Sequence, residues 1–231
     1  TLSAEELTSI AGNLANGAVI DLGEATFATT EFPMDFARKT NLQEIALPRN
    51  IQTFASEAYS GAFYNCTNLK RVTLPEGLTA IGANCFRQCS QLESIELPSS
   101  VRTLDIYAFY GCKLLTSVVI PEGVEAIPRF IFDSCTALTD VTLPSTLKSI
   151  GTEAFEATGL KEITIPESVT SVEAAVFKNC KSLERIQFPD ALTAIPANLC
   201  NACSALTTIN MPSKLETVGN DAFYNCGNLQ D

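Results

Sequence analysis

Residues 89–98 have the sequence Cys89-Ser90-Gln91-Leu92-Glu93-Ser94-Ile95-Glu96-Leu97-Pro98, and versions of this stretch return along most of the 231-residue chain. Its proline belongs to a series in which consecutive members lie 22, 23 or, once, 27 residues apart. The series is Pro48, Pro75, Pro98, Pro121, Pro144, Pro166, Pro189 and Pro212. A fixed period in this range is typical of a solenoid, in which each repeat forms one coil stacked on the previous one.

Within each repeat the pattern is C-x-x-L-x-x-I-x-L-P-x-x-V-x-x-I-G-x-x-A-F-x-x. The alternation I-x-L predicts a short strand with both apolar side chains on one face, and the proline ends that strand. Equivalent strands of stacked coils are expected to form a parallel sheet with strands about 4.8 Å apart. On the opposite side, segments such as Gly151 to Phe155 predict a tight turn followed by a short helical or 3-10 turn.

The two ends of the chain differ from the repeat. Residues 1–31 predict an N-terminal cap: Ser3 and Glu6 fit a capping box at the start of a helix, and Ile20-Asp21-Leu22 resembles a degenerate first strand. Residues 32–231 carry repeats of about 23 residues, the last of them truncated, so we expect one continuous structural domain. Solenoids usually end in a polar cap, and none is visible after Leu229. We therefore expect either that the natural protein continues or that another molecule, which includes a second copy of this chain, covers this edge.

The repeated proline, cysteine and Ala-Phe columns resemble BspA-like leucine-rich repeats over roughly residues 32–231. Four additional residues between Pro48 and Phe63, and one missing residue between Phe155 and Leu160, depart from that pattern. The resemblance implies an α/β repeat solenoid: a right-handed leucine-rich-repeat coil with a parallel sheet of short strands and short turns opposite. It also implies a bacterial protein that is secreted or anchored at the cell surface, related to adhesins, and it brings no catalytic residues.

Composition excludes several classes of partner. A net charge of −11 opposes binding to nucleic acid, and no apolar run is long enough to insert into a membrane. Histidine, the commonest general base and metal ligand, is absent. The carboxylates of Glu93 and Glu96 form a possible acidic pair for a hydrolase of surface polymers, a remote alternative, because they lie on an open strand. We therefore predict no enzyme activity and no cofactor.

Seven of the nine cysteines occupy one column of the repeat: Cys66, Cys89, Cys112, Cys135, Cys180, Cys203 and Cys226. This phase predicts a buried column of thiols that behave as small apolar side chains. The motif Cys200-Asn201-Ala202-Cys203 also has the spacing of a redox or zinc motif. That alternative requires a reactive thiolate or four converging ligands, and we expect neither and no metal.

Two surfaces are candidates for binding a partner. The first is an aromatic patch near the outer turns, made of Tyr59, Tyr64, Tyr107, Tyr110 and Phe130. Aromatic residues are enriched at binding hot spots, although the same residues also fit as packing between coils. The second is the sheet face, whose charged outward residues are Glu44, Arg71, Glu96, Asp140, Glu162 and Arg185. Solenoids often bind partners on such a face, although polar residues also suit a solvated strand.

The sequence thus predicts a non-catalytic bacterial surface or secreted protein that binds a host or bacterial protein or glycan in adhesion. The alternative is a purely structural spacer within a longer surface protein. Both agree with the repeat, since repetition explains most residues by packing alone.

Overall fold

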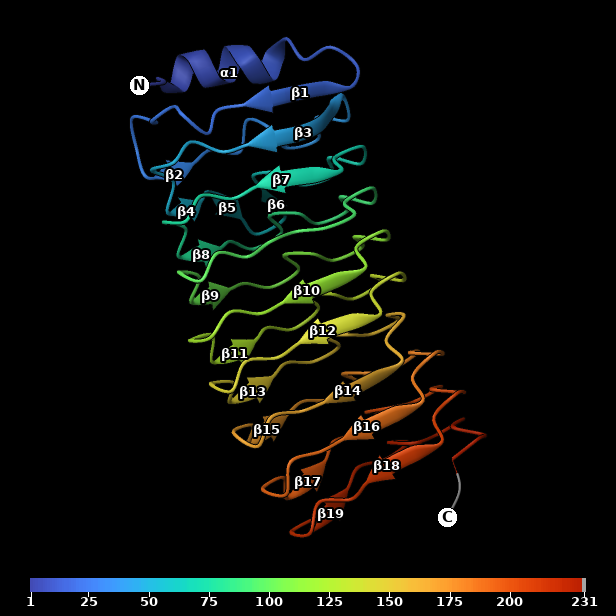
Figure 1. The fold of residues 1–231 in the computed structure, drawn as a ribbon. Coiled ribbons are helices and arrows are strands. Elements are labelled where there is room, and N and C mark those ends of the chain that lie inside the picture. Colours follow the sequence, from blue (N-terminus) through green and yellow to red (C-terminus); the bar gives the residue numbers. More distant parts are fainter. Residues whose placement is uncertain (230–231) are drawn as a thin grey trace.

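The computed structural model describes residues 1–229, and over them the chain coils into an elongated stack of repeats (Figure 1). The last two residues of the predicted repeat region lie outside the described residues. Helix α1 (Ala4–Gly12) lies across one end of the stack. The Oγ atom of Ser3 accepts a hydrogen bond from the Glu6 amide, and the Glu6 side chain accepts one from the Ser3 amide, so the predicted capping box is present.

One line of strands follows the I-x-L columns. It consists of β1 (Ala18–Asp21), β3 (Leu42–Ala46), β7 (Arg71–Thr73), β10 (Ser117–Val119), β12 (Asp140–Thr142), β14 (Glu162–Thr164), β16 (Arg185–Gln187) and β18 (Thr208–Asn210). Within the groups β1-β3-β7, β10-β12 and β14-β16-β18 these strands pair in parallel and follow the repeat. Ile163 thus lies opposite Ile186, and Ile186 opposite Ile209. Of the degenerate strand predicted at residues 20–22, Ile20 and Asp21 belong to β1, which pairs with β3, and Leu22 follows directly after it.

A second line of two-residue strands runs along the other side of the coils (Figure 1). It consists of β2 (Glu31–Phe32), β4 (Thr53–Phe54), β8 (Ala80–Ile81), β9 (Thr103–Leu104), β11 (Ala126–Ile127), β13 (Ser149–Ile150), β15 (Ser171–Val172), β17 (Ala194–Ile195) and β19 (Thr217–Val218). The only antiparallel pair among the described residues joins β5 (Ser56–Glu57) to β6 (Ser60–Gly61), and this hairpin accommodates the four-residue insertion.

These features confirm the predicted solenoid with parallel strands. The outer turns of the described residues differ from the prediction, because they contain no regular helix. Within residues 1–229, α1 is the only helix. The outer segments are instead pairs of hydrogen-bonded turns that flank each phenylalanine. Around Phe109, for example, Tyr107 and Gly111 have φ angles of 58° and 71°. Such left-handed residues interrupt any helical or 3-10 run, so no regular helical turn forms there.

The core is a column of stacked phenyl rings beside a column of thiols. Phe63, Phe86, Phe109 and Phe132 stack with centroids 5.4 Å apart at each step, and all four are fully buried. Beside them, the thiol of each column cysteine donates to a backbone carbonyl of the preceding coil, as Cys89 does to Phe63 at 3.1 Å. The thiols therefore satisfy buried acceptors that water cannot reach.

The first line of strands is interrupted twice. No strand forms at residues 94–96, between β7 and β10, and β12 does not pair with β14 among the described residues. The second interruption coincides with the repeat that is one residue short. There Gly159 approaches its neighbour so closely that an added Cβ atom would lie 2.6 Å from the Thr136 carbonyl oxygen.

Candidate functional site

The structure brings four of the five predicted patch residues together and adds two arginines. We define the aromatic–arginine surface as Arg38, Tyr64, Arg87, Tyr107, Tyr110 and Phe130. The rings of Tyr107 and Phe130 stack face to face, with centroids 4.8 Å apart and an interplanar angle of 5°. Tyr110 meets Tyr107 edge to face at 5.8 Å. These side chains come from outer turns of successive coils. Arg38 is exposed, and the other five are half-buried.

Arg87 lies at the centre of this surface. Its guanidinium carbon is 4.8 Å from the Tyr107 ring centroid, 5.1 Å from that of Tyr110 and 6.0 Å from that of Tyr64. The guanidinium carbon of Arg38 lies 5.6 Å from the ring centroid of Tyr64. Cations over aromatic faces are attracted by the ring quadrupole, and more strongly where water is excluded.

Sequence reasoning missed Arg87, although the repeat contains the signal. Arg87 occupies the column directly after the phenylalanine, and its equivalents in the coils before and after are Tyr64 and Tyr110. Its Nη1 atom donates to the Asn84 side chain at 3.1 Å, whereas its Nε atom is buried without a hydrogen-bond partner in the described part of the chain. The rings of Tyr64, Tyr107 and Tyr110 and the side chain of Asn84 therefore hold the Arg87 guanidinium in place, while its Nε–H donor stays unused.

The backbone under the stacked rings is unusual for aromatic residues. Tyr107 and Phe130 have φ angles of 58° and 60°. Their column is left-handed in every coil that follows the hairpin, and elsewhere it carries Asn84, Glu153, Ala175, Asn198 and Asp221. Asparagine and aspartate tolerate this conformation, while bulky side chains seldom adopt it and each costs of order 1 kcal/mol. Local backbone preference therefore does not explain two aromatic residues at this column.

Tyr59, the fifth predicted residue, lies apart from the stack. It sits in the turn of the β5–β6 hairpin with 81% of its surface exposed, and among residues 1–229 its ring pairs with no other. The hairpin is nevertheless linked to the surface through Asn84. The Asn84 amide lies 3.4 Å from the carbonyl oxygens of Glu57 and Ala58, and its side-chain oxygen accepts from Arg87.

The sheet-face residues form neighbouring pairs rather than one site. Arg71 binds Glu44 at 3.3 Å, and Arg185 binds Glu162 at 3.2 Å, each pair joining adjacent strands. Exposed pairs of this kind contribute little to stability. Asp140 lies exposed on β12, next in the column before Glu162. Glu96 lies on the coil that forms no strand, at the rim of a pocket that also includes Arg71.

The cysteines confirm the prediction of a buried thiol column. All nine are free in the described structure, and only Cys226 is more than marginally exposed. Burial raises the pKa of Cys180 to about 12 and that of Cys200 well above its ordinary value. A protonated, buried Cys200 is a poor nucleophile and a poor metal ligand, so the structure gives the Cys200–Cys203 spacing no reactive character.

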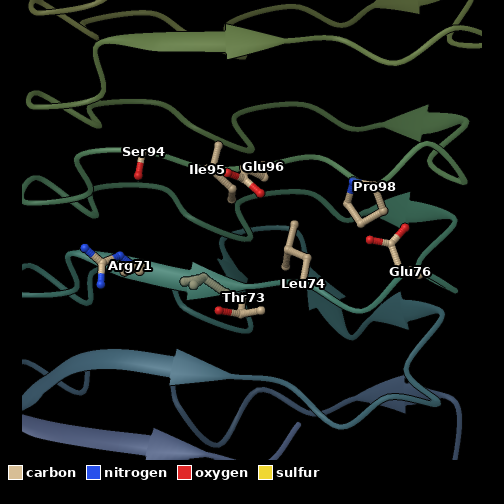
Figure 2. Close-up of a pocket in the computed structure, with 9 residues that line it drawn as sticks. Arg71, Thr73, Leu74, Glu76, Ser94, Ile95, Glu96 and Pro98 are labelled. Atoms are coloured by element: carbon tan, nitrogen blue, oxygen red, sulfur yellow. The ribbon is translucent and has the colours of Figure 1, made fainter.

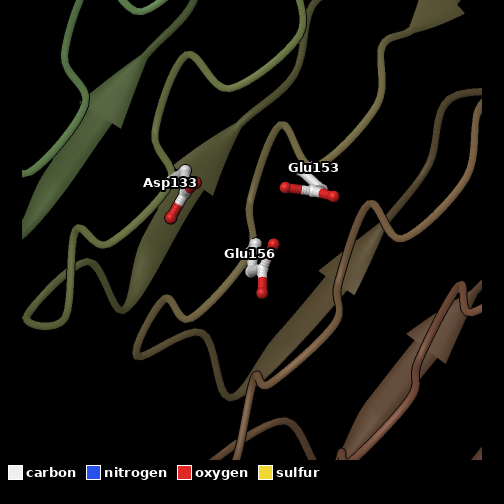
Figure 3. Close-up of side chains that lie close together, drawn as sticks. All are labelled: Asp133, Glu153 and Glu156. Atoms are coloured by element: carbon white, nitrogen blue, oxygen red, sulfur yellow. The ribbon is translucent and has the colours of Figure 1, made fainter.

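Three carboxylates outside the predicted surfaces also lie together (Figure 3). Ligand atoms of Asp133, Glu153 and Glu156 all fall within 4.8 Å of one another. Glu156 is bound by Lys178 at 3.2 Å and by the Asn179 amide at 3.0 Å. Burial and the nearby Glu156 raise the pKa of Glu153 to about 7, so this group holds a proton over part of the neutral range. Protonation and Lys178 both offset the crowded charge, and we assign no ligand to these residues.

Comparison with known families identifies the repeat. The model of the BspA type leucine rich repeat region matches residues 33–156 and 102–230. The chain belongs to the BspA-type leucine-rich repeat family. The family model describes a repeat region, in agreement with a solenoid whose columns are occupied by packing residues. A search of curated proteins finds no significant match.

Solved structures show the same fold. A leucine rich cell surface protein from Faecalibacterium prausnitzii is 27% identical with a TM-score of 0.71, and the match covers 94% of this chain and 69% of that one. A leucine-rich repeat protein from Eubacterium ventriosum is 21% identical with a TM-score of 0.65, over 89% of this chain and 67% of the other. The second likeness is one of fold alone. No helix in residues 1–229 has the length and apolarity to cross a bilayer.

Proposed function

We propose that this BspA-type chain is a non-catalytic binding protein, secreted or displayed at the bacterial cell surface, which acts in adhesion. Its partner is a host or bacterial surface protein or glycan held at the aromatic–arginine surface. The family and the F. prausnitzii cell surface protein support the location. The observation that carries the binding site is the Tyr107–Phe130 stack on a left-handed backbone.

Two properties of this surface favour binding over packing. Tyrosine and arginine are the residue types most enriched in energetic hot spots of interfaces. The Arg87 guanidinium already lies against the rings of Tyr107 and Tyr110. Because these side chains are ordered before a partner arrives, binding costs little of their conformational entropy. Ordinary packing between coils does not require aromatic residues here, because the equivalent coils further along the chain stack without them.

The test begins with a screen of the purified protein against immobilised host matrix proteins and a glycan array. Ile95→Asp, which places a charge at a buried column position, serves as the misfolded control. Binding that the control loses identifies a partner. No binding in either panel contradicts the adhesion proposal and favours the structural spacer.

The site itself is tested with the double variant Tyr107→Asn/Phe130→Asn. Asparagine suits the left-handed backbone, so we expect unfolding free energy to change by no more than about 1 kcal/mol while affinity for the partner falls at least tenfold. Asp221→Asn makes the same asparagine at an exposed position of the same column and should leave binding unchanged. Adding Tyr59→Ala to the double variant shows whether the hairpin contributes. Unchanged affinity in the double and triple variants would place the partner elsewhere.

A further inference from the structure

The interruption of the sheet at residues 94–97 leaves backbone groups without partners. In the described part of the chain, the amides of these residues donate to no other group, and their carbonyls accept from none. The Leu74 amide, which faces this coil, also lacks an acceptor. In the equivalent positions elsewhere the Leu47 amide donates to Thr73, and the Ile120 amide to Thr142, each at 3.0 Å. This stretch therefore leaves free the donors and acceptors that strands such as β3 and β7, or β10 and β12, use to bind each other.

A pocket of about 330 Å³ lies at the same place, between residues 71–76 and 94–98 (Figure 2). Val72, Leu74 and Ile95, all buried, form its apolar floor together with Pro98. Figure 2 shows Arg71 near one end of the pocket, and Glu76 near the other beside Pro98. The volume lies at the lower end of the range for small-ligand sites, which limits the occupant to a small molecule or the end of a longer one.

The spacing of the free groups favours a peptide as the ligand. Along an extended segment such as residues 94–97, amides and carbonyls recur about every 3.3 Å and alternate in direction. A short peptide in extended form repeats its own amides and carbonyls at that spacing, which is how peptides add to exposed sheet edges. The hydroxyl groups of a sugar follow no such repeat.

The charges favour a ligand that carries an ammonium group. Two carboxylates, Glu76 and Glu96, line the pocket, while its one cation, Arg71, is already bound to Glu44 at 3.3 Å. The remaining charge is negative, and an ammonium group offers three donors to these carboxylates.

The neighbouring coils limit how far the pocket can widen. On the far side of the same coils β8 and β9 pair in parallel, with Ile81 opposite Leu104. The Cys89 thiol also donates to the Phe63 carbonyl at 3.1 Å. These contacts hold the two coils together, so a whole strand cannot insert between them. Two or three residues of a peptide can bind at the open face.

We propose that this pocket binds a peptide segment of two or three residues that carries a primary ammonium group, either a free amino terminus or a lysine side chain. The free backbone groups of residues 94–97 and Leu74 bind its peptide groups, and Glu76 and Glu96 bind its ammonium group. This site is separate from the aromatic–arginine surface and does not depend on the adhesion proposal.

The test is a titration of the ¹⁵N-labelled protein with four small molecules, followed through the amide resonances. Alanyl-alanine amide offers an amino terminus, acetyl-alanyl-lysine amide offers a lysine, acetyl-alanyl-alanine amide has no ammonium group, and glucosamine offers an ammonium group on a sugar. We expect one or both ammonium peptides to shift the amides of residues 72–74 and 94–97, and the blocked peptide to leave them unchanged. The response of the first two shows which ammonium group is bound.

Matched variants test the role of charge. Glu96→Gln keeps the shape of the side chain and should weaken binding about tenfold, as the loss of one charge-assisted hydrogen bond would. Glu93→Gln, on the same coil but outside the pocket, should have no effect. The double variant Tyr107→Asn/Phe130→Asn should bind the peptides normally, so failure of the adhesion proposal remains distinguishable from failure of this one.

Three results of the titration would overturn the proposal. They are equal binding of the blocked peptide, binding of glucosamine in the absence of peptide binding, and no shift of these amides by any peptide at millimolar concentration. Peptide binding that is indifferent to both Glu96→Gln and Glu76→Gln would remove the ammonium group from the proposal and so would also overturn it.

Discussion

The outer turns of the two halves of the solenoid share one backbone but carry different side chains. Before residue 131 the left-handed column and the column after the phenylalanine contain Tyr64, Arg87, Tyr107, Tyr110 and Phe130, which contact each other. After it the left-handed column contains Glu153, Ala175, Asn198 and Asp221, and the column after the phenylalanine contains one aromatic residue, the exposed Tyr224. Since both sets stack at the same period on the same core, the fold does not select the aromatic set. The difference between the halves is therefore where we look for function.

The largest expected effect concerns what the halves share. Phe109→Ala in one half and Phe155→Ala in the other each remove a fully buried ring with stacked neighbours on both sides, at 5.4 Å for Phe109 and at 5.6 and 5.8 Å for Phe155. Each should lower the free energy of unfolding by about 3 to 5 kcal/mol, measured by urea denaturation. A loss confined to one half would show that the cores are not equivalent, and the comparison of their surfaces would fail.

A smaller effect is expected where coils approach each other through glycine. At Gly151 an added Cβ atom would lie 2.6 Å from the Arg129 amide nitrogen, whereas at Gly77 it would meet nothing within 4 Å. Gly151→Ala should cost about 1 to 3 kcal/mol, as overpacking does, and Gly77→Ala should stay within about 0.5 kcal/mol of the parent. At Gly82, in the aromatic half, the nearest atoms would be 3.2 Å away, so Gly82→Ala should fall between the two. Equal costs at Gly77 and Gly151 would contradict the close approach.

In the second half the left-handed column carries an ionisable residue, Glu153, where the first half carries Tyr107 and Phe130. Stability of the second half should therefore depend on pH through this residue. The raised pKa of Glu153, about 7 against an ordinary 4.5, means that the fold disfavours its ionised form. This cost is absent below about pH 4.5 and complete above about pH 7, so it removes stability as the pH rises. Glu153→Gln should therefore raise the melting temperature at pH 8 and leave it unchanged at pH 4.5. Glu125→Gln, at an exposed residue outside the cluster of Asp133, Glu153 and Glu156, is the control. An equal gain for Glu153→Gln at both pH values would contradict the proton held at Glu153.

The sequence was sufficient to predict the fold and to predict which aromatic side chains of the candidate surface lie together, because both depend on the columns of the repeat. The period predicts the parallel register, and the phase of Cys66 to Cys226 predicts burial. The same columns bring Tyr107 and Phe130 together on adjacent coils. The position of Arg87 beside Tyr107 can also be predicted from its column, which it shares with Tyr64 and Tyr110, when cations are considered together with aromatic residues.

Pairing between strands is less predictable, and residues 89–98 show why. This stretch fits the repeat as well as any other, and Ile95 is buried as expected, yet residues 94–97 form no strand. A strand requires hydrogen bonds from its neighbours, so it depends on how two coils sit against each other and not on one repeat alone. The pocket between residues 71–76 and 94–98 arises from that relation, and no column of the sequence indicates it.

The smallest expected effect concerns the ends of the thiol column. Cys66, near the capped end, is fully buried, while Cys226 near the other end is half-buried and its pKa is raised only to about 11. In the native protein at pH 8, iodoacetamide should alkylate Cys226 first, and the other eight thiols should react only as the protein unfolds, as followed by mass spectrometry. Cys226→Ser should remove the early reaction and change stability by no more than about 1 kcal/mol, since only one partly exposed hydrogen bond to the Cys200 carbonyl is altered. Early alkylation of Cys200 or Cys203 would instead reveal a reactive thiolate at the C-x-x-C spacing. It would also show that the C-terminal coils open more readily than the stacked core predicts.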